Sequence, residues 1–182
     1  PEETLGTVTV SIEMTTIGMG YLIEDYPIEI KKNTPFSQLL VENFKAMVGE
    51  EYEMQYTGTL DSSFYLKSIS CTYPFVVPNI PADLEEHLLA LNDPDSDEVV
   101  YDPEKYDPYV LGEFNICKGS GWMYWVSSYD TYPNHGMDQY YPQDGDVVRI
   151  RYTTYYGSDI GGSGAMGNGT NEGEGEGDWG EW

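Results

Sequence analysis

The stretch VVRIRYTT, residues 147–154, carries the clearest strand pattern in the chain and determines how the rest is interpreted. Val148, Ile150 and Tyr152 occupy one side of the alternation, and the two arginines between them occupy the other. Successive side chains of a strand point to opposite faces of its sheet, so this pattern predicts a half-buried strand with its apolar residues inward. We therefore expect a sheet with this strand as one of its central members.

The segment GWMYWV, residues 121–126, predicts a second strand shortly before it. Alternation places Trp122 and Tyr124 on one face and Met123 and Trp125 on the other, so at least half of these aromatic residues belong to the core. Trp125 and the tyrosines of the following loop are the candidates for exposure, where they could stack on a sugar, a flat ligand or a neighbouring subunit. These predicted contact residues are Trp125, Tyr129, Tyr132, Tyr140 and Tyr141.

Earlier segments supply the remaining elements of an α+β fold. Residues 7–14 and 21–32 alternate as the two strands of a hairpin, and residues 35–48 carry the apolar stripe of a helix. Residues 51–58 and 64–70 predict two further strands. We expect one domain over residues 1–156. Residues 72–112 form an acidic, proline-rich insertion with a short second helix, in which the prolines exclude a central strand.

The composition of the chain limits the classes of partner that we expect it to bind. Its 182 residues, 40% of them hydrophobic, suffice for one domain with a core. Eight basic residues stand against 32 acidic ones, a formal net charge of −24, which repels phosphate backbones and anionic lipids. Without a run of 18 or more apolar residues, the sequence offers no membrane-spanning helix. We therefore expect neither nucleic acid nor membrane insertion.

Residues 157–182 change composition and are predicted to form a flexible tail. They contain ten glycines and six acidic residues, too little apolar area to offset the entropy of ordering the chain. Trp179 and Trp182 are unusual in such a segment and could dock on a neighbouring copy, as extended peptides do at sheet edges. The alternative is a simple linker.

Four segments together suggest a family: NTPFSQLL (33–40), LKSIS (66–70), GWMYWV (121–126) and YYPQDGDVVRIRYT (140–153). Over about residues 7–71 and 113–154 the chain resembles the transcobalamin-like C-terminal domain of secreted and surface proteins of Gram-positive bacteria. Members usually carry V-N-G after the aromatic strand, where this chain has Val126-Ser127-Ser128.

This resemblance implies a β-grasp fold related to soluble-ligand-binding domains, with a mixed sheet packed on one main helix. It also implies an extracellular or cell-surface location and a binding role without catalysis. The related domain of animal cobalamin carriers closes over the corrinoid beside a helical partner domain, so corrinoid binding is a minor alternative.

The acidic segment from residue 93 to residue 104 is a candidate calcium loop. Asp93, Asp95, Asp97 and Glu104 stand at positions 1, 3, 5 and 12, from which oxygen ligands can converge on one hard cation. Glu98 occupies the position where the sharp turn of such a loop favours glycine. A solvated acidic loop is the alternative.

Cys71 and Cys117 lack the C-x-x-C spacing of redox and zinc motifs. We expect a disulfide between them, because the strands near both cysteines are plausible neighbours in a β-grasp arrangement; two buried free thiols are the alternative.

The sequence offers no positioned catalytic group. His87 and His135 are isolated, without a serine or cysteine nucleophile in a recognisable motif. The leading hypothesis is thus a non-enzymatic binding or adhesion module that contacts a soluble ligand, a glycan or a surface protein. The alternative is a self-assembling subunit of an extracellular fibre whose C-terminal tail docks on the next copy.

Overall fold

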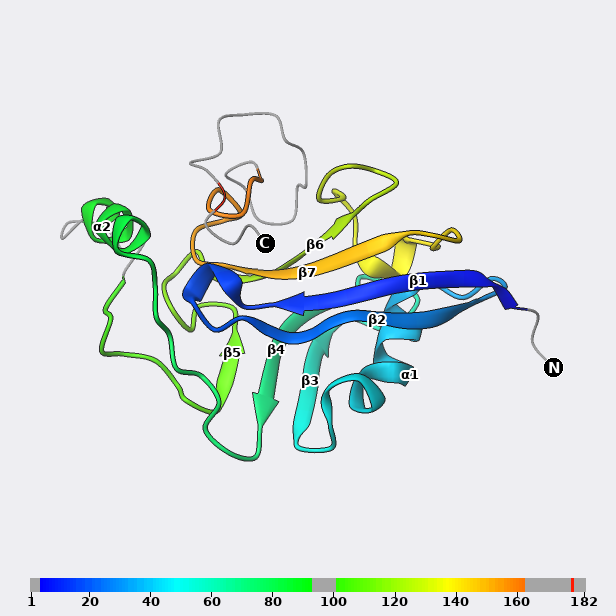
Figure 1. Ribbon diagram of the computed structural model, residues 1–182, viewed down its shortest axis with the longest axis horizontal. Helices are drawn as coiled ribbons and strands as arrows, with labels where there is room; N and C mark the ends of the chain where they lie inside the picture. The colour runs from blue at the N-terminus through cyan, green and yellow to red at the C-terminus, as the bar shows by residue number, and fades with distance from the viewer. Residues whose placement is uncertain (1–3, 93–100, 163–177, 179–182) are drawn as a thin grey trace.

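A computed structural model describes residues 4–92, 101–162 and 178 of the chain (Figure 1). Within these residues the fold is α+β, with two α-helices, a mixed four-stranded sheet and an antiparallel three-stranded sheet. The strands of the two sheets run in clearly different directions (Figure 1). We expected a single mixed sheet, and the division into two sheets corrects that expectation.

The four-stranded sheet has the order β2-β1-β7-β6, built from β1 (Thr4–Glu13), β2 (Tyr21–Lys31), β6 (Gly121–Val126) and β7 (Val147–Thr153). β1 is antiparallel to β2 and parallel to β7, and β7 is antiparallel to β6. The apolar alternation of β1 and β7 sets this register, in which Val10 lies beside Val148 and Ile12 beside Ile150. All four side chains are fully buried.

The second sheet has the order β3-β4-β5, built from β3 (Tyr52–Thr57), β4 (Tyr65–Cys71) and β5 (Val110–Gly112). β5 lies within the proline-rich region 72–112, where we expected no central strand. It is a three-residue strand that follows Pro108, lies at the edge of its sheet and pairs with Ser68–Ser70 of β4. Proline is compatible with this position because it precedes the strand.

The helices α1 (Phe36–Val48) and α2 (Ala82–Leu91) lie on opposite sides of the three-stranded sheet in the view of Figure 1. α1 buries its apolar stripe, including Phe36, Leu40 and Phe44, and contacts β2 and β3. α2 is shorter and buries Leu84 and Leu88. No described helix has the length and apolar character needed to cross a membrane.

Residues 154–162, directly after β7, belong to the folded structure. Residues 157–162 fold back so that Ile160 is 1% exposed and packs with Met123 and Tyr132. The Thr154 N–H donates to the Asp159 carboxylate at 2.7 Å, which holds this turn in place. The packed part of the chain therefore extends past residue 156, the boundary that its glycine content predicted.

Candidate functional site

The candidate site is a pocket of about 240 Å³ beside β6. Residues 64–66 at the start of β4, residues 122–124 of β6 and residues 132–137 of the loop after β6 line it. The pocket thus lies where β6, an edge strand of the four-stranded sheet, meets the start of β4, the central strand of the three-stranded sheet. The two segments are almost sixty residues apart in the sequence.

Two hydrogen bonds fix the loop that forms one wall of the pocket. The Phe64 N–H donates to Oδ1 of the buried Asp138 at 3.0 Å, and the Tyr124 hydroxyl donates to the His135 carbonyl at 2.8 Å. Between them, Gly136 has no room for a side chain, because a Cβ there would lie 2.4 Å from Asp138 Oδ1. These contacts hold the loop against both sheets.

The lining of the pocket is aromatic and apolar, with the polar side chains of Asn134 and His135 in the loop. Its lining residues, all of them described, include no Lys or Arg. Burial raises the pKa of Tyr124 and of Tyr65, so both hydroxyls stay neutral and can donate hydrogen bonds. The pocket is suited to an uncharged aromatic or apolar group.

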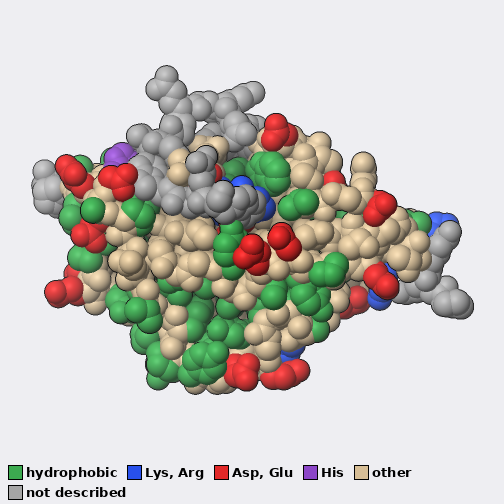
Figure 2. All heavy atoms as spheres, in the orientation of Figure 1, with side chains coloured by type: hydrophobic (Ala, Val, Ile, Leu, Met, Phe, Trp, Pro, Cys, Tyr) green, Lys and Arg blue, Asp and Glu red, His purple; other side chains and the backbone are tan. Residues whose placement is uncertain are grey.

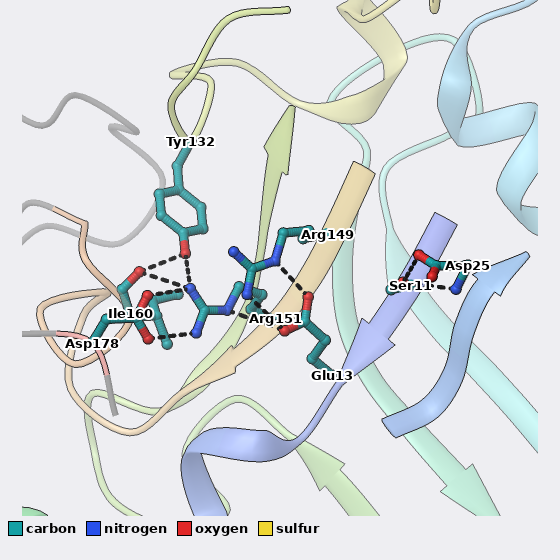
Figure 3. A network of polar contacts seen from close by, with 8 residues as sticks. All are labelled: Ser11, Glu13, Asp25, Tyr132, Arg149, Arg151, Ile160 and Asp178. Atoms are coloured by element: carbon teal, nitrogen blue, oxygen red, sulfur yellow. Dashed lines mark hydrogen bonds and ion pairs between the residues drawn. The ribbon is translucent and has the colours of Figure 1, made fainter. Parts of the chain in front are cut away.

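A buried charge network lies on the outer face of the four-stranded sheet (Figure 3). Glu13 accepts two hydrogen bonds from Arg149, at 2.8 and 3.0 Å. Arg151 donates to both carboxylate oxygens of Asp178, at 2.7 and 2.8 Å, and to the Tyr132 hydroxyl at 3.0 Å. Because Tyr132 also lines the pocket, the network helps to fix that part of the pocket lining.

Burial disfavours the charged forms of the side chains in this network, and the pairing of opposite charges offsets that cost. The Glu13 side chain is fully buried, and this burial raises its pKa, whereas the hydrogen bond and charge of Arg149 lower it. Burial alone would lower the pKa of Arg151, but Asp178, Tyr132 and Glu13 raise it above its ordinary value, so Arg151 stays charged. The guanidinium group of Arg151 lies between Asp178 and Glu13 (Figure 3).

The five predicted contact residues differ in how exposed their side chains are. Tyr129 and Tyr141 are exposed, as expected, and Trp125 is half-buried with the Arg149 guanidinium 6.0 Å from its ring centroid. Tyr132 and Tyr140, which we expected to be exposed, are buried. Their hydroxyls find internal acceptors: Tyr132 donates to the Ile160 carbonyl at 2.6 Å, and Tyr140 to Asp146 Oδ2 at 2.6 Å.

Of these five residues, Tyr132 alone lines the pocket. No motif in the sequence marks Phe64, Tyr65, Leu66 or Met137 as site residues, and His135 stands out there only as an isolated histidine. Residues 64–66 have an ordinary strand pattern, and only the approach of β4 to β6 brings them to the site. The available signal was the position of His135 in a Pro-Asn-His-Gly loop directly after the aromatic strand.

The predicted disulfide is not formed, and Cys71 and Cys117 are both free, buried thiols. The expectation was wrong because β4 and β6 belong to different sheets, and β4 pairs with β3 and β5. The Cys117 thiol instead donates to the Thr154 carbonyl.

Three of the four predicted calcium ligands, Asp93, Asp95 and Asp97, lie outside the described residues. The fourth, Glu104, is exposed, and its N–H donates to Asp102 Oδ1 at 3.0 Å. Among the residues that the structure describes, no group of three or more acidic, histidine or cysteine side chains could hold a metal ion. Trp179 and Trp182, the predicted docking residues, also lie outside the described part.

No family model matches the chain, and no curated protein matches it.

Proposed function

We propose that this protein is a non-enzymatic binding module, displayed outside the cell or on its surface, and that the pocket beside β6 is its ligand site. The observation that carries the proposal is the pocket itself: a concave lining of aromatic and aliphatic residues with two polar side chains in the same loop. Ligand sites in proteins have this composition, in which apolar surface supplies affinity and a few polar groups fix orientation.

The arrangement of the four-stranded sheet supports the finer assignment to the β-grasp fold. The hairpin of β1 and β2 is followed by α1, and the last strand, β7, returns parallel to β1. The same features support the resemblance to transcobalamin-like C-terminal domains, from which the extracellular location is inferred.

The volume of the pocket limits the ligand. An apolar cavity of about 150 Å³ binds benzene in a well-studied case. A pocket of about 240 Å³ therefore has room for one or two rings or a large apolar side chain. A corrinoid macrocycle would have to lie outside it, so we favour a smaller group over cobalamin.

The fibre-subunit alternative requires the C-terminal segment to reach another copy. The one described residue beyond position 162, Asp178, contacts Arg151 of its own chain through two hydrogen bonds. This contact within one chain favours the binding module over the assembly subunit.

Blocking the pocket tests the proposal, with indole as the probe. Asn134 is exposed and lines the pocket, so Asn134→Trp should obstruct it without disturbing the core. Gln139→Trp, at an exposed position that does not line the pocket, is the matched control. In ligand-observed saturation-transfer NMR, we expect indole to bind the native protein and the control, and to lose most of its signal with Asn134→Trp. Equal signals from all three proteins, or none from any, would refute the pocket as the site.

A further inference from the structure

The free edge of β6 adds a second binding element to the pocket. β6 is the last strand of its sheet and pairs with β7 on one side only. Along its other edge, the described part of the chain makes one pairing, an antiparallel bridge between Val126 and Thr131. After Thr131 the pairing with β6 ends, and Pro133 has no N–H with which it could continue.

Alternation along β6 shows which backbone groups face this edge. The Ser127 N–H donates to Val147 next to β7, whereas the Val126 N–H donates outward to Thr131. The pairing of β6 with β7 continues without a register shift from Val126 back to Gly121. The backbone N–H and C=O groups of Trp122 and Tyr124 therefore point away from β7, in the same direction as the Val126 N–H.

These outward groups lie at the pocket, because Trp122 and Tyr124 both line it. A partner in extended conformation could hydrogen-bond to the edge and place one apolar side chain between β6 and the start of β4. Strand addition of this kind obtains affinity from the main chain and specificity from side-chain pockets. The bridge between Val126 and Thr131 is one antiparallel pairing on this same edge.

The electrostatics of the site define the chemistry of the partner. The lining carries no Lys or Arg, and Glu113 contacts the Tyr65 hydroxyl at one side of the pocket. Asp130 is exposed directly before the bridging Thr131. Acidic side chains also outnumber basic ones on the face shown in Figure 2, in keeping with the net charge of −24. A partner with basic residues flanking its apolar residue is complementary to this surface.

We propose that the ligand of the pocket is an extended, basic peptide segment that adds to the edge of β6 and inserts one aromatic or large aliphatic side chain into the pocket. This inference rests on the proposed function, since it specifies the class of ligand for the same site.

Amide hydrogen exchange followed by NMR tests the edge in the free protein. The amides of Met123 and Trp125, which face β7, should exchange at least about 100-fold more slowly than those of Trp122 and Tyr124. Equal protection of all four amides would overturn the proposal, because the edge would then be closed.

The peptide itself is tested with a phage-displayed library of short random peptides flanked by lysines, selected on the full chain. Enriched peptides should share one aromatic or large aliphatic position, bind Asn134→Trp at least about tenfold more weakly, and protect the amides of Trp122 and Tyr124. In synthetic copies of an enriched peptide, N-methylation of the alternate amides that face β6 should weaken binding about tenfold. Methylation of the intervening amides, which point away from β6, should change binding little.

Two negative outcomes are distinguishable. If indole binds the native protein in an Asn134-dependent way while no peptide is enriched, strand addition is wrong and the pocket remains a small-molecule site. If neither indole nor any peptide binds, the proposed function fails together with this inference.

Discussion

At the scale of single residues, both arginines of the chain lie in the same buried charge network. Arg149 and Arg151 are the only arginines in the sequence, and their side chains are 15% and 1% exposed. Taking such charges out of water is favourable only where carboxylates and further hydrogen bonds pair them, as Glu13 and Asp178 do here. The network therefore connects the outer face of the sheet to Asp178 and to Tyr132 at the pocket.

The two cysteines give a prediction at the same scale. Burial raises the pKa of the Cys117 thiol to about 12, so at a pH of about 8 almost none of it is the reactive thiolate. We expect a thiol reagent such as DTNB to label neither cysteine readily in the native protein, because both are buried. In guanidinium chloride without reductant, it should label two thiols per chain.

The variant Cys71→Ser provides the control, since its single remaining signal in denaturant reports Cys117 alone. Finding no reactive thiol in the denatured native sequence would reveal a disulfide and contradict the structure. Rapid labelling of the folded Cys71→Ser variant would contradict the burial of Cys117.

At the scale of elements, the turn after β7 shows how composition can mislead. The Thr153 hydroxyl accepts the Gly157 N–H at 2.8 Å, and Asp159 Oδ2 accepts the Thr154 hydroxyl at 2.5 Å. These contacts reverse the chain so that Ile160 packs on the outer face of the sheet beside Met123. A short segment can thus bury one well-placed side chain, although the average composition of residues 157–182 resembles that of a disordered tail.

Truncation of Ile160 tests this packing. Ile160→Ala should lower the free energy of unfolding by about 2–4 kcal/mol, because it removes buried methyl groups and leaves a cavity. Val77→Ala, at a side chain that is 68% exposed, should change it by less than about 0.5 kcal/mol. Urea denaturation of both variants and the native chain measures the difference. Equal stabilities of the two variants would mean that residues 157–162 do not pack as described.

The helices and strands also differ in whether the sequence alone could predict them. Alternation and helical periodicity identified β1, β2, β6, β7 and α1, because their apolar faces are defined by local pattern alone. The separation of β3–β5 into a second sheet and the short β5 depend on contacts between distant segments, which no local pattern encodes. The pocket was missed for that reason: two of its walls, residues 64–66 and 122–124, meet only in the folded chain.

At the scale of the whole molecule, charge and shape act together on the choice of partner. The net charge of −24 disfavours anionic partners and accelerates encounters with basic ones at low ionic strength. The pocket concentrates aromatic surface at the junction of the two sheets, and acidic side chains outnumber basic ones on the face shown in Figure 2. We infer that long-range attraction brings a basic partner to the surface and that the pocket then selects its apolar group.

The central claim, that the pocket beside β6 is the ligand site, is tested most directly by NMR of labelled methionine methyl groups. The chain has seven methionines, of which Met123 and Met137 line the pocket, while Met14 and Met47 lie in the core and do not line it. On titration with indole, we predict that the Met123 and Met137 signals shift with a common affinity while those of Met14 and Met47 stay in place. Unchanged Met123 and Met137 signals, or shifts confined to the other methionines, would contradict the claim.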